Sequence, residues 1–364
     1  MKRRHRKRRR KNYKKLIIPA FIVLVSILTI GYSAFQTNIS LSVRGNIVEK
    51  SKTTFQILSN IEVQSNNSTV SGLYKEDNNY IYKGDNPHNY ISLEKAANED
   101  SLYRIISFNK ETGEDSYSLK VIKNKALSSA FSWDSYKNRA NTGGFCNYGF
   151  GCKIWGSSQT MMDSNENIIT KMPRELNGTE YDLPDQEASL NVYLNNEWYN
   201  SLPNNIKKYI IKHLFNVGYG AGNSQNEIKQ HESDYKWRGY IGLMALSEYY
   251  SASTATLCPE VTTGTGFHDS YTTSTYCKNN NWLYKPYYQW TITPDTHVNG
   301  YSSYVYYITD YGSAGSSGYE GTGACSGMHS IHPVFYLSSD LVLTGKGTET
   351  DPYIIEGFNK DTNN

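Results

Sequence analysis

The chain has 364 residues, which is long enough for one large domain or two smaller ones. Its 37 Lys and Arg against 34 Asp and Glu give a formal net charge of +3. Eleven of these basic residues and no acidic residue lie within residues 1–15, so the remainder carries 26 basic and 34 acidic groups, a net charge of −8. A nucleic-acid partner is therefore not expected, because such binding needs basic residues gathered on a folded face.

The basic segment, residues 1–15, is followed by an apolar stretch, residues 16–35. As a helix this stretch is roughly 30 Å long, which matches the hydrocarbon core of a bilayer. Gly31-Tyr32-Ser33 also has the small-x-small pattern of a signal peptidase site. A retained transmembrane anchor and a cleaved signal peptide both fit. In either case residues 1–15 stay in the cytoplasm, residues 16–35 enter the cytoplasmic membrane and the rest is exported, as a single-pass membrane protein or a secreted one.

Residues 36–100 are rich in Ser, Asn, Lys and Glu, and we expect a stalk or a small β appendage there. Weak strand patterns lie at residues 36–50 and 54–58. The main folded domain is expected at residues 101–357, with a short tail at residues 358–364.

The main domain begins with a predicted hairpin, whose strands are residues 102–108 and 117–122. Two helices follow. The first is predicted from an apolar residue at every fourth position, namely Leu190, Leu194, Trp198 and Leu202. The second covers residues 206–217 and ends at Gly218.

The central stretch, residues 240–294, organises the rest of the domain. It contains a predicted core strand at residues 240–246, a polar loop and an aromatic segment at residues 281–294. Further strands are predicted at residues 304–308, 332–337 and 341–343. Together these elements predict an α+β fold with a mixed antiparallel sheet, two helices and long irregular loops.

The five cysteines agree with export. Cys146 and Cys152 flank a Gly-rich turn suited to a local disulfide, and Cys258 and Cys277 enclose the polar loop. Cys325 is left over, either free or exchanged into another pairing, because spacing alone does not fix connectivity. A zinc site is not expected, since the chain has no C-x-x-C pair and His329 and His332 lie near a single cysteine.

An ordered set of short segments resembles an uncharacterised domain family of exported proteins from Gram-positive bacteria (Firmicutes), over about residues 90–357. These segments are Leu102-Tyr103-Arg104-Ile105-Ile106, Tyr193-Leu194-Asn195 with Trp198-Tyr199, Tyr240-Ile241-Gly242-Leu243-Met244, Asn281-Trp282-Leu283, Trp290-Thr291-Ile292-Thr293-Pro294, His332-Pro333-Val334-Phe335-Tyr336-Leu337 and Asp351-Pro352-Tyr353. The family's usual Arg-Pro before the last of these strands is His332-Pro333 here. Residues 31–46 resemble the N-termini of surface and fibre-associated proteins of the same bacteria.

More distantly, the order of elements resembles the C-type-lectin-like fold, which formylglycine-generating enzymes share. That chemistry needs two neighbouring cysteines, and Cys325 is followed by no second cysteine. No catalytic residue is therefore expected. Calcium is not expected either, because residues 163–167 lack the turn glycine of a calcium loop and Arg174 stands at the position of its bidentate glutamate. We predict no cofactor and no metal.

Aromatic side chains are the remaining functional signal, since the chain has 32 tyrosines. Tyr and Trp are favoured at binding surfaces because they offer large contact area at low entropic cost. The predicted ligand-binding residues are Trp282, Tyr284, Tyr287, Tyr288 and Trp290, with burial in the core as the alternative for each. The predicted function is an exported bacterial surface protein that binds a glycan, cell-wall or protein ligand without catalysis. The alternatives are a structural surface or fibre-associated subunit and an enzyme of the formylglycine-generating superfamily.

Overall fold

The structure is a computed structural model that describes residues 52–94, 98–111, 116–127, 130–135, 145–147, 151–174, 176, 178–222, 224–254, 258, 278–296, 304–317 and 329–356. All of them belong to one compact unit that spans residues 51–364. The unit is α+β, with sheets and few helices, as the sequence predicts. No helix in these ranges is long and apolar enough to cross a bilayer, and the predicted anchor or signal at residues 16–35 lies outside them.

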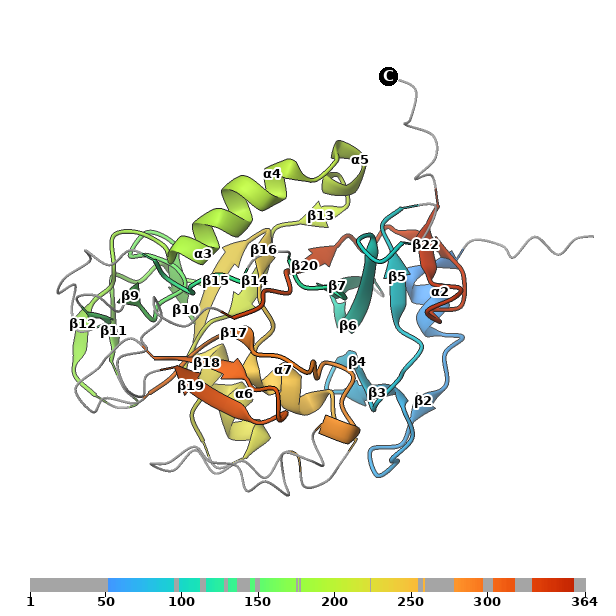
Figure 1. The fold of residues 1–364 in the computed structure, drawn as a ribbon, viewed down its shortest axis with the longest axis horizontal. Helices are drawn as coiled ribbons and strands as arrows, with labels where there is room; N and C mark the ends of the chain where they lie inside the picture. Colours follow the sequence, from blue (N-terminus) through green and yellow to red (C-terminus); the bar gives the residue numbers. More distant parts are fainter. Residues whose placement is uncertain are drawn as a thin grey trace, which may run out of the picture. The chain divides into compact units, whose positions relative to one another are not determined.

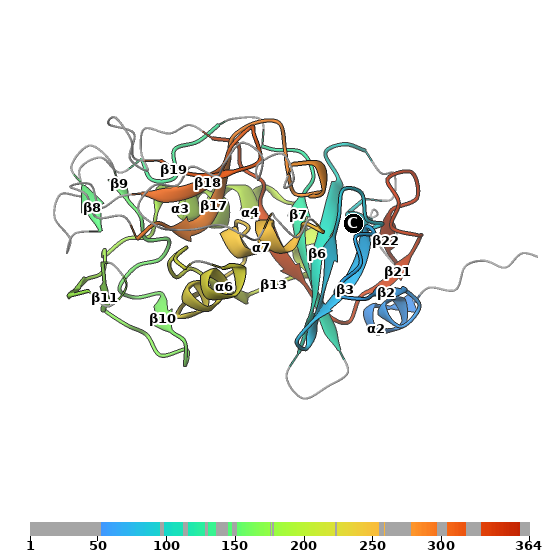
Figure 2. The same cartoon turned by 90° about the horizontal axis from the view of Figure 1, so that it is seen from below.

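The hairpin of β6 (Leu102–Lys110) and β7 (Tyr117–Lys123) is the centre of the largest sheet, and it confirms the predicted hairpin. All seven residues of β7 are buried. Figures 1 and 2 both place the hairpin between α7 (Leu246–Ser251) and the paired strands β21 (Val342–Thr344) and β22 (Tyr353–Ile355). Both faces of the hairpin are therefore covered.

Within the described ranges this sheet has twelve strands and branches on either side of the hairpin. One edge of β6 pairs with both β5 and β4, while β7 pairs with β20 (Val334–Leu337), which in turn pairs with two short strands. The remaining strands are β1 (Lys52–Thr53), β2 (Val63–Gln64), β3 (Gly72–Glu76), β4 (Asn79–Lys83), β5 (Tyr90–Ser92), β13 (Ile210–Ile211) and β16 (Ile241–Gly242). The pairs β2–β3 and β5–β22 are parallel, so the sheet is mixed.

The expected stalk at residues 36–100 is not separate from the main domain where the structure describes it. Strands β2 to β5 continue the large sheet, and Tyr80 and Ile81 of β4 pair with Phe108 and Ser107 of β6. Residues 54–58, which we expected as a strand, form the helix α2 (Thr54–Leu58) instead. Helix α2 places Ile57 and Leu58 in the core, so the polar composition of this region concealed a folded part of the domain.

The first predicted helix is confirmed as one continuous helical run made of α3 (Ser189–Val192), η1 (Tyr193–Trp198) and α4 (Tyr199–Ser201). Its middle segment is π-helical. Four residues advance an ordinary α-helix about 40° beyond a full turn, so an apolar residue at every fourth position drifts around it. The wider turns of the π segment reduce this drift. Asn195 joins the run to β16, because its Oδ1 accepts from the N–H of Ile241 at 3.0 Å and its Nδ2 donates to the Ile241 carbonyl at 2.9 Å.

The second predicted helix, residues 206–217, is wrong. Only α5 (Asn204–Lys207) is helical, and the chain continues as β13 and β14 (His213–Asn216). Ile210 pairs with Leu337 of β20, and Phe215 pairs with Trp237 of a neighbouring strand. The apolar spacing fits a helix. However, Ile210 and Ile211 are β-branched residues that also favour strands, and pairing with the free edge of β20 stabilises the strand.

The predicted strand at residues 240–246 is shorter than expected. It ends at Gly242 of β16, and the chain turns into α7 at Leu246. The carboxylate of Glu248 accepts from the N–H of Ala245 at 2.9 Å, which stabilises the first turn of the helix. A Cβ at position 242 would lie 2.6 Å from the ring of Phe215, so glycine is needed where β16 crosses that ring.

Glu232, at the end of α6 (Gln225–Ser233), joins three elements through one buried carboxyl group. Its Oε1 accepts from the N–H of Ser247 in α7 at 3.2 Å and from the hydroxyl of Thr293 in β17 (Gln289–Pro294) at 2.6 Å. Its Oε2 accepts from the hydroxyl of Ser247. Burial raises the pKa of Glu232 to about 7, although these hydrogen bonds oppose the rise.

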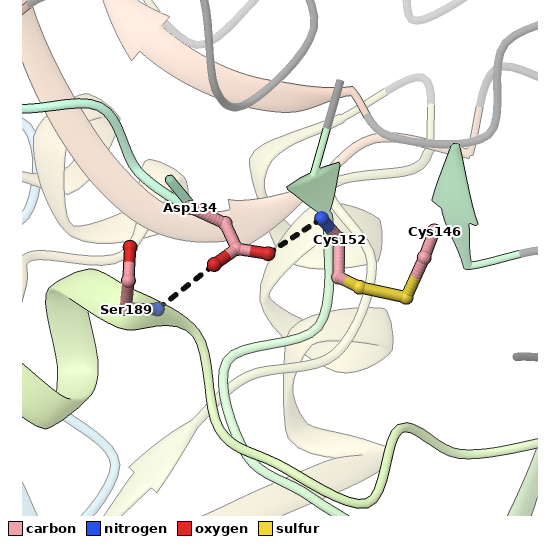
Figure 3. Close-up of a disulfide and its surroundings, with 4 residues drawn as sticks. All are labelled: Asp134, Cys146, Cys152 and Ser189. Atoms are coloured by element: carbon pink, nitrogen blue, oxygen red, sulfur yellow. Dashed lines mark hydrogen bonds between the residues drawn. A yellow bond between two sulfur atoms is a disulfide. The ribbon is translucent and has the colours of Figure 1, made fainter. Parts of the chain in front are cut away.

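The disulfide between Cys146 and Cys152 is confirmed. It links β8 (Cys146–Asn147) to β9 (Gly151–Cys152). Figure 3 shows the buried carboxylate of Asp134 beside it, where Oδ2 accepts from the N–H of Cys152 at 2.8 Å and Oδ1 from the N–H of Ser189 at 3.0 Å. Cys258 is buried and disulfide-bonded. Its predicted partner Cys277 and the fifth cysteine, Cys325, lie outside the described residues.

Besides the β8–β9 pair, the described residues form three smaller sheets. They are β10–β15–β14, β11–β12 and β17–β18–β19. Their remaining strands are β10 (Met161–Asp163), β11 (Lys171–Pro173), β12 (Glu180–Asp182), β15 (Tyr235–Gly239), β18 (Val305–Ile308) and β19 (Ala314–Ser317). Strands β17, β18, β20 and β21 fall within the predicted segments 281–294, 304–308, 332–337 and 341–343, apart from Thr344 at the end of β21.

Candidate ligand-binding surface

Two of the five predicted binding residues are buried. Trp282 is 4% exposed and Trp290 is 2% exposed. The indole N–H of Trp282 donates to the Tyr82 carbonyl at 2.8 Å, and that of Trp290 donates to the Phe131 carbonyl at 2.8 Å. Neither ring can offer an open face to a ligand in this structure, so the alternative of a core position fits both.

Trp282 also holds the buried guanidinium of Arg104, whose central carbon lies 4.6 Å from the centre of the indole ring. Arg104 donates to the side chain of Asn89 at 2.7 Å and to the Pro87 carbonyl at 3.1 Å. Burial lowers the pKa of Arg104 to about 10. Trp282 therefore joins β6 to the segment that leads into β17.

Tyr284 and Tyr287 are half-buried and use their hydroxyl groups inside the protein. Tyr284 donates to the Asp310 carbonyl at 2.7 Å, and the hydroxyl of Tyr287 lies 3.1 Å from Nε2 of His332. Lys285, between them in sequence, donates to the side chain of Asn124 at 3.3 Å. Burial, together with the nearby charge of Arg104, lowers the pKa of Lys285 to about 8.

Tyr288 is the exposed member of the predicted set, with 43% of its surface accessible. Its ring meets the rings of Tyr307 and His329 edge to face, at centre distances of 5.5 Å and 5.4 Å. A backbone hydrogen bond from Ser330 to the Tyr288 carbonyl, 2.9 Å long, fixes the segment that carries His329 beside it. The rings of Tyr307 and His329 therefore hold the ring of Tyr288 in position.

Tyr288, Trp290, Tyr307 and His329 form one contiguous group of rings, which we call the aromatic platform. Trp290 and Tyr307 are paired across β17 and β18. His329 lies 4.2 Å from the ring centre of Trp290 and 4.3 Å from that of Tyr307. Trp290 forms the buried base, Tyr307 and His329 are half-buried, and Tyr288 is exposed. Aromatic pairs at these distances stabilise each other, so the exposed ring is held in place before any ligand arrives.

Polar groups lie close to the platform. Burial raises the pKa of Tyr288 and that of Tyr307, and the charge of Asp310 raises both further, so their hydroxyls remain neutral donors at pH 7. Within the described residues Oδ1 of Asp310 has no hydrogen-bond partner. Tyr311, next in sequence, is 59% exposed. Ring faces beside hydroxyl donors suit a ligand with apolar C–H faces and hydroxyl groups, such as a sugar.

Sequence reasoning missed three of these groups, Tyr307, His329 and Asp310. Tyr307 could have been found by pairing the predicted strands, because it lies opposite Trp290. His329 follows a Gly/Ser-rich stretch and reaches the platform through the isolated bridge between Gln289 and Ser330. No sequence pattern predicts that bridge.

Residues 163–167, considered above as a calcium loop, form a turn that uses the carboxylate internally. Oδ1 of Asp163 accepts from the N–H groups of Asn165 and Asn167, both at 2.9 Å. Across the described part of the chain, no group of three His, Cys, Asp or Glu side chains could hold a metal ion.

Comparison with known proteins gives no relative: no protein-family model, no curated protein and no solved structure matches the chain.

Proposed function

We propose that the protein is an exported bacterial cell-surface protein that recognises a glycan, cell-wall or protein ligand through the aromatic platform, without catalysis. The observation that carries the proposal is the exposed ring of Tyr288 on its base of Trp290, Tyr307 and His329. Exposed aromatic rings held in a fixed position are typical of binding surfaces, because little entropy is lost when a ligand stacks on them.

Export is supported by the basic and apolar segments at residues 1–35 and by the disulfide between Cys146 and Cys152. Disulfides of this kind persist in oxidising compartments outside the cytoplasm. Membrane anchoring and secretion after cleavage remain the two forms of this proposal.

Within the α+β class, we propose a C-type-lectin-like arrangement. Its support is the order of elements: the β6–β7 hairpin, the helical run 189–201, β16, and the late strands β17, β18 and β20. In this arrangement the ligand-binding surface lies on the segments between the late strands, where the aromatic platform is found.

The test is binding of the full-length protein to an array of bacterial glycans and cell-wall fragments. We expect the wild type to bind a defined subset. Tyr288→Ala should weaken that binding about tenfold, since an aromatic contact of about 1 kcal/mol or more is lost. Tyr240→Ala is the control, because Tyr240 is half-buried and its ring contacts another tyrosine, Tyr199, but it lies outside the platform.

Failure of the folded wild type to bind any glycan, wall fragment or surface protein would contradict the proposal. Concentration-dependent polymers seen by electron microscopy in that case would favour a structural surface subunit instead.

A further inference from the structure

A cavity of about 290 Å³ lies apart from the aromatic platform, between the β6–β7 hairpin and α7. The hairpin contributes Ser107, Asn109 and Lys120 to its wall, and α7 contributes Glu248 and Ser251. Strands β3, β4, β14, β15 and β20 and helix α6 also contribute to the lining. A volume near 300 Å³ is at the small end of ligand pockets, so the cavity is sized for a small molecule.

An ion pair between Lys120 and Glu248 forms part of this lining. The side chain of Lys120 is 7% exposed, and its ammonium group bonds Oε1 of Glu248 and the hydroxyl of Tyr336. Burial alone lowers the pKa of Lys120, but Glu248 and Tyr336 outweigh burial and raise it, so the lysine stays charged. An ammonium group has three N–H donors, and these two bonds leave one for a ligand.

Glu248 offers the complementary acceptor. One of its carboxylate oxygens accepts from Lys120 and the other from the N–H of Ala245 at 2.9 Å. A carboxylate has about four lone-pair positions, so it can accept further hydrogen bonds. Its side chain is 22% exposed. The ion pair therefore presents a donor and an acceptor side by side.

A β-bulge in β6 shapes the wall next to this pair. Ile105 is paired with Val121 and Ser107 with Lys120, so Ile106 is an extra residue with no counterpart in β7. The extra residue moves Ser107 into register with Lys120, and both line the cavity. Bulges of this kind are frequent next to ligand sites because they redirect a side chain.

The lining carries the charged residues Glu76, Lys120, Lys229, Lys236 and Glu248, and all of them except Lys236 are held in ion pairs with one another. Lys229 pairs with Glu76 at 3.3 Å and with Asp77 at 3.7 Å, and Lys236 donates to the Ser164 carbonyl at 2.9 Å. Burial lowers the pKa of His213, which favours its neutral form. A charged ligand would have to compete with these pairs or leave a buried charge unmatched, and both are costly. A neutral ligand with hydroxyl groups can bond the donor and the acceptor without disturbing them.

Two further features suit such a ligand. The imidazole of His213 and the ring of Tyr336 are stacked, with centres 3.7 Å apart and planes 13° apart, and both residues line the cavity. Because the two rings cover each other's inner faces, the apolar C–H face of a sugar would stack on an outer face of the pair. The remaining polar lining consists of amides and hydroxyls, from Asn79, Asn109, Asn216, Ser107, Ser247 and Ser251.

We propose that this cavity binds a neutral polyhydroxylated molecule about the size of one monosaccharide. One hydroxyl of the ligand donates to Glu248 and an adjacent hydroxyl accepts from Lys120, while Ser107 and Asn109 bond the rest of the ring. This site is separate from the aromatic platform, and it stands whether or not the platform binds a glycan.

The test is saturation-transfer NMR and calorimetry on the full-length protein with D-glucose, D-galactose, N-acetylglucosamine and myo-inositol as probes. D-glucuronate, an anion, and D-glucosamine at pH 6, mostly a cation, serve as charged probes of similar size. We expect at least one of the neutral probes to bind and the charged probes to bind at least tenfold more weakly.

Two variants locate the binding in the cavity. Asn109→Leu removes a wall amide and fills its space, and should weaken binding at least tenfold. Ser107→Ala is a minimal change that keeps the fold, and should weaken binding severalfold. Tyr288→Ala, on the aromatic platform, should leave this binding unchanged.

Three outcomes would overturn the proposal: none of the neutral probes binds, a charged probe binds more tightly than all of them, or Tyr288→Ala abolishes binding that both cavity variants retain. The last result would assign the sugar to the platform alone. Binding by the cavity with a silent glycan array would instead leave this site standing and contradict the function proposed for the platform.

Discussion

The hydroxyl of Tyr287 donates to Nε2 of His332 across 3.1 Å, and the two rings lie parallel, with planes 5° apart. On the other side of the imidazole, Nδ1 lies 2.8 Å from the Lys123 carbonyl, which can only accept, so Nδ1 carries the proton. The bond from Tyr287 requires a neutral imidazole that accepts at Nε2, whereas Nδ1 can donate to Lys123 in either protonation state. Burial lowers the pKa of His332 to about 4, and the nearby charge of Lys285 contributes.

The first prediction concerns acid stability. The pKa of His332 is about 4 in the folded protein and near 6.5 when unfolded, so between these values the unfolded chain binds the extra proton. This residue therefore lowers the free energy of unfolding by about 3 kcal/mol as the pH falls from 6.5 to 4. His332→Gln, whose amide can accept from Tyr287 and donate to Lys123, should remove that loss in urea unfolding curves recorded across this range.

Glu232 gives a second prediction with the opposite sign. Its pKa is raised from 4.5 to about 7 by burial, so the folded protein keeps the proton and stability falls as the pH rises from 4.5 to 7. Between pH 4.5 and 6.5 the two residues oppose each other. We expect Glu232→Gln to become more stable with rising pH there and His332→Gln to become less stable. If the unfolding free energy changed with pH at the same slope in the wild type and in both single variants, the pKa shifts assigned to Glu232 and His332 would be contradicted.

The third prediction concerns Trp282. Trp282→Phe keeps an aromatic ring over Arg104 but removes the N–H that bonds the Tyr82 carbonyl. Leaving that buried acceptor without this donor should cost about 1–3 kcal/mol of unfolding free energy. Tyr288→Phe serves as the control and should change stability by less than about 0.5 kcal/mol, since its ring is exposed. A stable Trp282→Phe variant with impaired ligand binding would instead restore Trp282 to the binding surface.

The fourth prediction concerns the disulfide. Cys146 and Cys152 are six positions apart, so the closed loop is short. In the chain-entropy model the bridge contributes about 2 kcal/mol. The double variant Cys146→Ser/Cys152→Ser should lose about that much stability, and any further loss on adding a reductant would then come from the remaining cysteines, including the disulfide-bonded Cys258. A matched loss in Cys146→Ser by itself would confirm that the two cysteines act as one bridge.

The sequence was most informative where the local residues alone determine the secondary structure of a segment. The β6–β7 hairpin follows from strong alternating strands around a turn, and the helical run 189–201 follows from its repeated apolar positions. The bridge between Cys146 and Cys152 follows from their closeness in the chain. Each of these needs little information from distant residues.

The prediction was wrong where contacts with a segment far away in the sequence determine the local secondary structure. Ile210 and Leu214 fit a helical spacing, but Ile210 pairs with the edge of β20, more than a hundred residues later in the chain. Thr54 to Leu58 fit a strand by composition, yet they pack as a helix against β7 and β21. Local propensity is a weak guide wherever an unpaired strand edge or an apolar face is available.

The same distinction applies to the predicted binding residues. Composition correctly marked residues 282–290 as rich in aromatic side chains, but it could not separate Trp282 and Trp290, which are buried, from Tyr288, which is exposed. Their exposure depends on β6, β18 and residues 329–330, which come from three other parts of the chain. The Lys120–Glu248 pair is a further example, because its members are 128 positions apart.

The three bonds of Glu232 have a consequence for hydrogen exchange. The residue contacts Ser247 and Thr293, which lie 15 and 61 positions further along the chain. Opening α6, α7 or β17 alone would leave a buried carboxyl group or its donors without partners. The backbone amides of these three elements should therefore exchange with solvent as one group, with a common opening free energy, although loops separate them in sequence.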